Sequence, residues 1–162
     1  VLEHNGEHKG WKLPETTLAL PWIVRMFPEA KYVYWVRDPR DCILKGHVTD
    51  DLARFGVDYP PTDDEYRRRA ISWKYQYELI EATPRPKHWI HVRFEDFVLD
   101  QEATLERLSE FLGLPLAQVP VRPEAVGRYR QKPELPSFGF LTPLMQRYGY
   151  DISDHVFANE VS

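Results

Sequence analysis

A short run of charged residues follows an apolar segment early in the chain. Residues 31–36 read KYVYWV, and they lead directly into Arg37, Asp38, Pro39, Arg40 and Asp41. If residues 31–36 form a strand of an open parallel sheet, the charged run lies beyond its carboxyl end, where such sheets bind ligands. The Arg37 guanidinium and the free N–H groups of a following helix would together hold a phosphate. The run therefore predicts an anion site.

The same residues allow a structural alternative in which the charges neutralise one another. Arg37 and Arg40 have carboxylates close by at Asp38 and Asp41, so both guanidiniums could be paired within one turn. Charge-assisted hydrogen bonds contribute about 1.5–3 kcal/mol each, which is enough to hold such a turn. Residue types alone leave both interpretations open.

The elements that would position this run follow from local patterns. The nearly continuous apolar character of residues 31–36 predicts a strand buried on both faces of a parallel sheet, and residues 88–93 form a second strand. Asp38 is a good N-cap and Pro39 suits the first helical position, so we expect residues 41–52 to continue as a helix. Strands alternating with helices predict an α/β fold.

Further helices are indicated by apolar spacing and capping residues. Residues 16–27 have helical spacing, with Pro21 in the first turn or at a kink. Thr62 and Glu65 have capping-box spacing before a long helix. Asp100 caps another helix that ends at Gly113, and residues 141–148 form a short one.

Composition limits the class of protein. With 162 residues, 43% of them hydrophobic, the chain forms one domain spanning residues 1–162. The net charge of −4 argues against nucleic-acid binding through phosphates. A single cysteine, Cys42, excludes an intramolecular disulfide, which favours a reducing cytoplasm. No run approaches the roughly 20 apolar residues of a membrane span, so we expect no membrane association.

Several ordered sequence blocks resemble one family. WKLPETTLALPWIVRMFPEAK at residues 11–31, VRDPRD at 36–41 and HVRFEDFVLDQEATLERLSEFLGLP at 91–115 are similar to sulfotransferases that use 3′-phosphoadenosine 5′-phosphosulfate (PAPS). The bacterial and tyrosylprotein enzymes are the nearest group. The resemblance implies a P-loop-NTPase-like parallel sheet flanked by helices. It also implies sulfuryl transfer from PAPS to a hydroxyl or amine, with no metal.

The resemblance also assigns residues to the donor nucleotide. Arg37 matches the family arginine that holds the 3′-phosphate, and Lys45 falls where the family usually has a serine with the same role. On a helix starting near Pro39, Lys45 would lie about two turns in and reach the phosphate as a point charge. Phe94 matches an aromatic residue, commonly tyrosine, that lies against adenine. Arg128 matches a basic residue that closes over the 3′-phosphate.

Catalytic assignments are less complete. Lys12 matches a lysine near the bridging oxygen of the donor, where stabilising leaving-group charge would accelerate transfer. The histidine that serves as base in cytosolic members is Pro14 here, which leaves Glu15 and His8 as nearby alternatives. The first strand and the Gly/Ser/Thr-rich loop that cradles the 5′-phosphosulfate are expected upstream of Val1. A chain without them would bind the nucleotide but not transfer sulfate.

Two other functional classes compete with this interpretation. His4, Glu7 and His8 fit the H-x-x-E-H pattern of zinc hydrolases, although Asn5-Gly6 favours a turn rather than the required helix. A non-catalytic nucleotide-binding or interaction module on the same scaffold is the second alternative.

The sequence gives little information on the acceptor, which could be a small molecule, a carbohydrate or a peptide, and none on oligomeric state. The loop of residues 55–62 is where acceptor contacts are expected. Trp22, Tyr59 and Tyr66 could line an apolar or sugar-binding wall, with core packing as the alternative.

Overall fold

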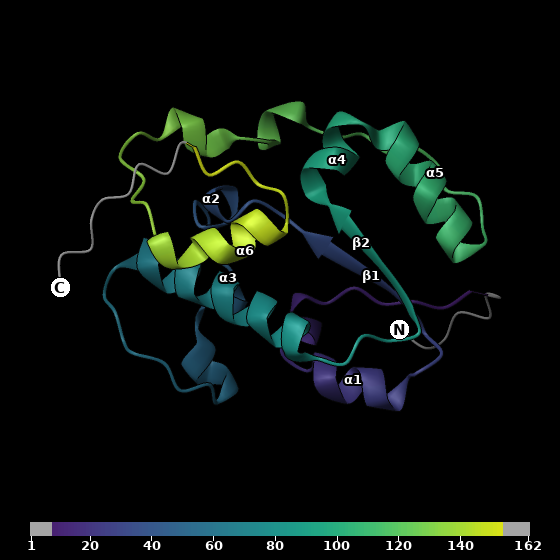
Figure 1. Ribbon diagram of the computed structural model, residues 1–162, viewed down its shortest axis with the longest axis horizontal. Coiled ribbons are helices and arrows are strands. Elements are labelled where there is room, and N and C mark those ends of the chain that lie inside the picture. The colour runs from purple at the N-terminus through teal and green to yellow at the C-terminus, as the bar shows by residue number, and fades with distance from the viewer. Residues whose placement is uncertain (1–7, 154–162) are drawn as a thin grey trace.

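The computed structural model describes residues 8–153, which form six α-helices and two β-strands (Figure 1). The helices are α1 (Leu20–Met26), α2 (Pro39–Cys42), α3 (Glu65–Ala82), α4 (Phe94–Leu99), α5 (Gln101–Leu112) and α6 (Thr142–Arg147). The strands are β1 (Lys31–Val36) and β2 (His88–Arg93), with the bounds that the sequence predicts. Short 3₁₀ helices lie at Pro14–Thr17, Val48–Asp50, Leu52–Phe55, Pro123–Ala125, Arg128–Gln131 and Gly139–Leu141.

The two strands pair in parallel at the centre of the fold. Lys31 lies opposite His88 and Val36 lies opposite Arg93, so both strands end at the same edge of the sheet. Helices α3 and α6 lie on one side of the strands, and α4 and α5 lie on the other (Figure 1). This arrangement confirms the predicted α/β fold with a parallel sheet flanked by helices.

The prediction that β1 is buried on both faces is wrong for the residues described. Tyr34 packs between Tyr77 and Tyr148, with ring centroids 5.8 and 6.2 Å away. On the opposite face, however, Val33 and Trp35 remain 40% and 41% exposed. Trp35 contacts only the Phe97 ring of α4 among the described aromatic residues, at 5.1 Å. The second face of β1 is therefore only partly covered by residues 8–153.

The helix expected over residues 41–52 ends much earlier, at Cys42. In a continuing helix the Ile43 carbonyl would accept a hydrogen bond from the His47 N–H. Instead, Arg69 Nη1 of α3 donates to that carbonyl at 3.0 Å, and the His47 N–H donates to Asp50 Oδ2 at 2.6 Å. A tertiary contact and a local cap thus replace the helical ladder, and Lys45 lies beyond α2 rather than within it.

Two other helix predictions need correction in detail. The region 16–27 is split into the 3₁₀ helix Pro14–Thr17 and α1, which begins at Leu20 with Pro21 in its first turn. Helix α3 is capped by Asp64, whose carboxylate accepts from two backbone N–H groups, and not by a Thr62–Glu65 capping box. Asp64 offers a charged acceptor one residue before the helix, which makes it the better N-cap.

The remaining helix signals are confirmed. Asp100 accepts from Ala103 N and caps α5, while Gly113 ends α5 in the left-handed conformation, with φ of 75°. Helix α4 has no predicted counterpart, because no element is predicted between the strand at residues 88–93 and the cap at Asp100.

The core joins α3 to the C-terminal region across the carboxyl end of β1. Its buried members are Val36, Ile43, Ala70, Trp73, Tyr77, Phe138, Leu141, Leu144, Met145, Tyr148 and Tyr150. Residues beyond 135 therefore cover the sheet edge that carries the charged run. None of the helices in the described part of the chain has the length and apolar character needed to cross a bilayer.

Candidate functional site

Three segments that are distant in sequence meet at the carboxyl end of β1. Arg37 follows β1, Phe94 follows β2, and the third segment comprises residues 125–129. The Arg37 guanidinium carbon lies 4.3 Å from the centre of the Phe94 ring, and Arg37 Nη2 donates to the Ala125 carbonyl at 2.6 Å. The structure thus brings Arg37 and Phe94 together as the parallel pairing requires.

Arg128 joins the same site through Asp41. Arg37 Nη2 lies 3.6 Å from Asp41 Oδ2, and Arg128 Nη2 donates to the Asp41 carbonyl at 3.5 Å. Within residues 8–153, the Nε atoms of both arginines are buried and have no hydrogen-bond partner. Buried N–H donors are normally satisfied, so each of these two Nε–H groups could still donate a hydrogen bond to an oxyanion.

A buried network fixes the turn that carries Arg37. The Asp38 carboxylate pairs with Arg40 at 2.7 Å, and the Asp38 N–H donates to Glu95 Oε1 at 2.9 Å. Glu95 also accepts from the Tyr150 hydroxyl at 3.0 Å. Burial, and then the nearby Glu95 carboxylate, raise the pKa of Tyr150, so its hydroxyl stays protonated and keeps donating.

The local ion-pair alternative is therefore correct for one arginine. Arg40 is buried against Asp38, and its guanidinium carbon lies 4.1 Å from the centre of the Tyr129 ring. Arg40 therefore has a structural role. Arg37 differs, because its side chain is 25% exposed and its contact with Asp41 is longer.

Backbone donors at the start of α2 do not contribute to an anion site, contrary to the prediction. The Arg40 N–H donates to Asp38 Oδ1 at 2.9 Å, and the N–H groups of Asp41 and Cys42 both donate to the Asp38 carbonyl at 3.1 Å. The Arg37 N–H donates to the Tyr77 hydroxyl at 3.1 Å. These four N–H groups are therefore not available to an anion beside Arg37.

Lys12 and Lys45 lie at a second place, a cleft of about 500 Å³ along β1. Both lysines are exposed and line the cleft together with Trp11, Tyr34, Trp35, Arg69 and Trp73. Arg37, Phe94 and Arg128 are not among its lining residues. The predicted site residues thus form two groups, which adjoin at Cys42: it lines the cleft, and its Sγ lies 3.9 Å from the Arg37 carbonyl.

The other predicted residues lie outside both groups. Glu15 is in the 3₁₀ helix beside Lys12 but does not line the cleft, and neither do Trp22, Tyr59 or Tyr66. Trp22 is 63% exposed, whereas Tyr66 packs against the core.

The residues of the zinc-hydrolase pattern can be placed only in part. His8 is exposed, while His4 and Glu7 are outside the described residues. Residues 8–153 contain no group of three or more His, Cys, Asp or Glu side chains arranged to hold a metal.

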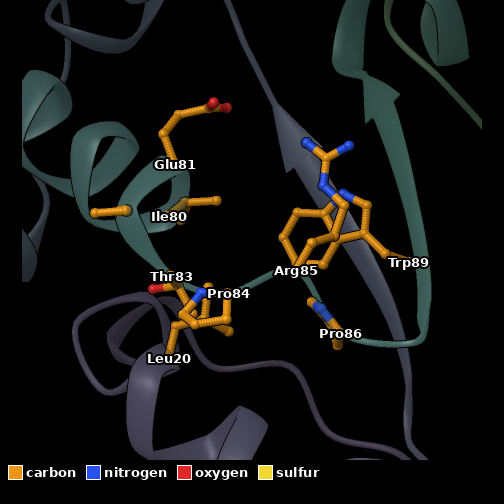
Figure 2. Close-up of a pocket in the computed structure, with 9 residues that line it drawn as sticks. Leu20, Ile80, Glu81, Thr83, Pro84, Arg85, Pro86 and Trp89 are labelled. Carbon is orange, nitrogen blue, oxygen red and sulfur yellow. The ribbon is translucent and has the colours of Figure 1, made fainter.

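A smaller cavity of about 320 Å³ lies near the amino end of β2 (Figure 2). The Arg85 guanidinium carbon lies 6.0 Å from the centre of the Trp89 ring, and the two side chains lie side by side in the close-up (Figure 2). The Glu81 carboxylate already accepts from Tyr148 Oη at 2.6 Å and Arg147 Nη1 at 3.0 Å. We therefore assign no chemistry to this cavity.

Fold and geometry together describe an α/β protein in which two arginines, Arg37 and Arg128, lie near the carboxyl end of a parallel strand. A family model described as "Sulfotransferase family" matches residues 1–118. The chain belongs to the sulfotransferase family.

Individual relatives are distant and longer. The chain is 27% identical over 109 residues to a "Putative protein-tyrosine sulfotransferase" of Caenorhabditis briggsae, an alignment covering 66% of this chain and 37% of that protein. It is 28% identical over 126 residues to the "3-alpha-hydroxysteroid sulfotransferase" of Cavia porcellus, covering 67% of this chain and 42% of the relative. The chain thus spans about two fifths of the length of these relatives.

A solved structure has the same fold. The "Sulfotransferase Domain from the Curacin Biosynthetic Pathway" superimposes with a TM-score of 0.60 at 17% identity, over 86% of this chain and 62% of that chain.

Proposed function

We propose that this chain forms part of a PAPS-dependent sulfotransferase and that Arg37 and Arg128 hold the 3′-phosphate of the donor. The pair of buried, unpartnered Nε donors, joined through Asp41, is the observation that carries this proposal. A phosphate monoester has three oxygens and a charge near −2, so it can accept from both guanidiniums at once. Family membership supports the donor class.

The chemistry proposed for the remaining residues follows from the cleft. Lys12 lines the cleft beside an aromatic wall, and in this proposal it stabilises the charge that develops on the leaving oxygen during sulfuryl transfer. Lys45 lines the same cleft and not the Arg37 site, so we propose this role for it in place of the 3′-phosphate contact that the resemblance implies. Phe94 keeps an aromatic ring beside Arg37, and we propose that this ring also contacts the adenine. The acceptor in this proposal carries a hydroxyl or amine. Protein-tyrosine and hydroxysteroid names among the relatives favour a hydroxyl on a peptide or a small molecule.

Calorimetry with the full chain tests the nucleotide site. We expect 3′-phosphoadenosine 5′-phosphate to bind at least tenfold more tightly than 5′-AMP, because only the former has a phosphate for Arg37 and Arg128. Arg37→Ala should weaken binding of the bisphosphate at least tenfold and leave 5′-AMP almost unaffected. Arg25→Ala, an exposed arginine at the end of α1, is the matched control. Equal affinity of wild type and Arg37→Ala for the bisphosphate would contradict the proposal.

A non-catalytic nucleotide-binding module is the second candidate function. One observation favours it: neither β1 nor β2 is followed by a glycine-rich phosphate loop, since β1 leads into Arg37-Asp38-Pro39 and β2 into α4. Transfer of radiolabelled sulfate from PAPS to a tyrosine peptide or a hydroxysteroid separates the two functions. Nucleotide binding without any transfer by the full-length gene product would favour the binding module.

A further inference from the structure

Asp41 is an almost fully buried carboxylate whose two oxygens contact one distant segment. Asp41 Oδ2 accepts from the Gly127 N–H at 2.8 Å, and Oδ1 accepts from the Tyr129 N–H at 3.0 Å. These residues are 86 and 88 positions away in sequence, and Asp41 is only 1% exposed. Because each oxygen of this buried carboxylate accepts a backbone N–H, Asp41 forms a specific contact between α2 and the C-terminal region.

The two hydrogen bonds bracket Arg128. They hold the N–H groups of the residues before and after it, and Arg128 Nη2 itself donates to the Asp41 carbonyl at 3.5 Å. Gly127 turns the chain with φ of 72°, and a Cβ at this position would collide with the Arg130 guanidinium. The direction of the Arg128 side chain therefore depends on Asp41 as well as on the glycine turn.

We propose that Asp41 is a positioning residue, which docks residues 127–129 onto α2 and so directs Arg128 to the anion that Arg37 binds. This inference rests on the proposed nucleotide function of the Arg37 site. Asp41 itself does not contact the anion. Its carboxylate contributes by restraining residues 127–129, so that Arg128 is held in a fixed position.

Electrostatics alone predicts the opposite effect, which makes the proposal testable. The Asp41 carboxylate lies 3.6 Å from Arg37, so removing its negative charge should strengthen anion binding through Coulomb attraction. Positioning predicts that removal weakens binding. A purely structural role predicts that binding weakens to the same extent whether or not Arg128 is present.

A double-mutant cycle with 3′-phosphoadenosine 5′-phosphate as the calorimetric probe distinguishes these roles. The asparagine in Asp41→Asn keeps the size of the side chain but can accept from only one of the two N–H groups. We expect Asp41→Asn and Arg128→Ala each to weaken binding about tenfold or more, and the double variant to lose no more than about twofold beyond either single one. Unchanged or tighter binding by Asp41→Asn, or fully multiplicative losses, would overturn the proposal.

Hydrogen exchange in the nucleotide-free chain tests the docking independently. The Gly127 and Tyr129 N–H groups should exchange at least about tenfold faster in Asp41→Asn, while N–H groups within α3 keep their protection. Asp64→Asn is the matched control, because Asp64 also accepts from two backbone N–H groups, at 2.9 and 3.1 Å, at the start of α3. That variant should leave Gly127 and Tyr129 protected.

The two proposals can fail separately. If wild type does not bind the nucleotide, the proposed function is wrong and exchange still decides whether Asp41 docks the segment. If wild type binds but protection at Gly127 and Tyr129 is unchanged in Asp41→Asn, the positioning role is wrong.

Discussion

Removing the Tyr150 hydroxyl, which supports the turn that carries Arg37, should destabilise the whole fold. Tyr150 Oη donates to Glu95 Oε2 at 3.0 Å, and Glu95 Oε1 accepts from the Asp38 N–H that begins the Arg37 turn. Tyr150→Phe keeps the ring and its contact with Arg93 but removes the donor. Glu95 is only 8% exposed, so water does not readily replace the lost bond.

The magnitude follows from the charge of the acceptor. A hydrogen bond to a charged group contributes about 1.5–3 kcal/mol, so we expect the free energy of unfolding to fall by about 2 kcal/mol. With a urea m-value of about 2 kcal/mol/M, the midpoint should drop by roughly 1 M at unchanged m.

Urea unfolding followed by far-UV circular dichroism measures this difference. Tyr148→Phe is the matched control: Tyr148 donates to Glu81, whose side chain is 26% exposed and can be rehydrated. We expect the control to lose less than half as much stability. A loss below about 0.5 kcal/mol in Tyr150→Phe, or equal losses in the two variants, would refute the reasoning.

Two further predictions concern the turn and the aromatic cluster. Gly127→Ala should cost about 1–2 kcal/mol in chemical unfolding, because φ is 72° at Gly127, while Gly139→Ala, with no positive φ and no atom within 4 Å of its Cβ, should cost much less. Equal costs would contradict the conformational argument. Burial between Tyr34 and Tyr148 lowers the pKa of His91. The unfolded chain therefore takes up a proton first as pH falls below about 6.5, and stability should decrease there. His91→Phe should reduce the loss of stability between pH 7 and pH 5, and an unchanged loss would argue against this role.

Local sequence patterns were sufficient for the strands and for part of the site. The β-branched and aromatic runs at Lys31–Val36 and His88–Arg93 fix both strands, and parallel pairing then places Arg37 beside Phe94. What the patterns do not show are the contacts made across long sequence separations. Arg69 from α3 takes the Ile43 carbonyl and so ends α2, against the local helical preference.

The least predictable part of the site is the contribution of the C-terminal segment. Asp41 looks like an ordinary charged residue of a turn, and its partners at Gly127 and Tyr129 are more than 80 positions away. Gly127 is a usable signal, since glycine supplies the positive φ that many tight turns need. The occupied N–H groups at the start of α2 agree with the predicted role of Asp38 as N-cap, because its carboxylate accepts from the Arg40 N–H that an anion would otherwise use.

The Ala125 carbonyl and the Phe94 ring have one more consequence for ligand binding. They hold the Arg37 guanidinium in place in the nucleotide-free protein, at 2.6 and 4.3 Å respectively. An unrestrained arginine would lose up to about 2 kcal/mol of rotamer entropy on contacting a ligand. In this chain that entropy is lost during folding, so the arginine is preorganised and a larger part of its interaction energy is available as affinity.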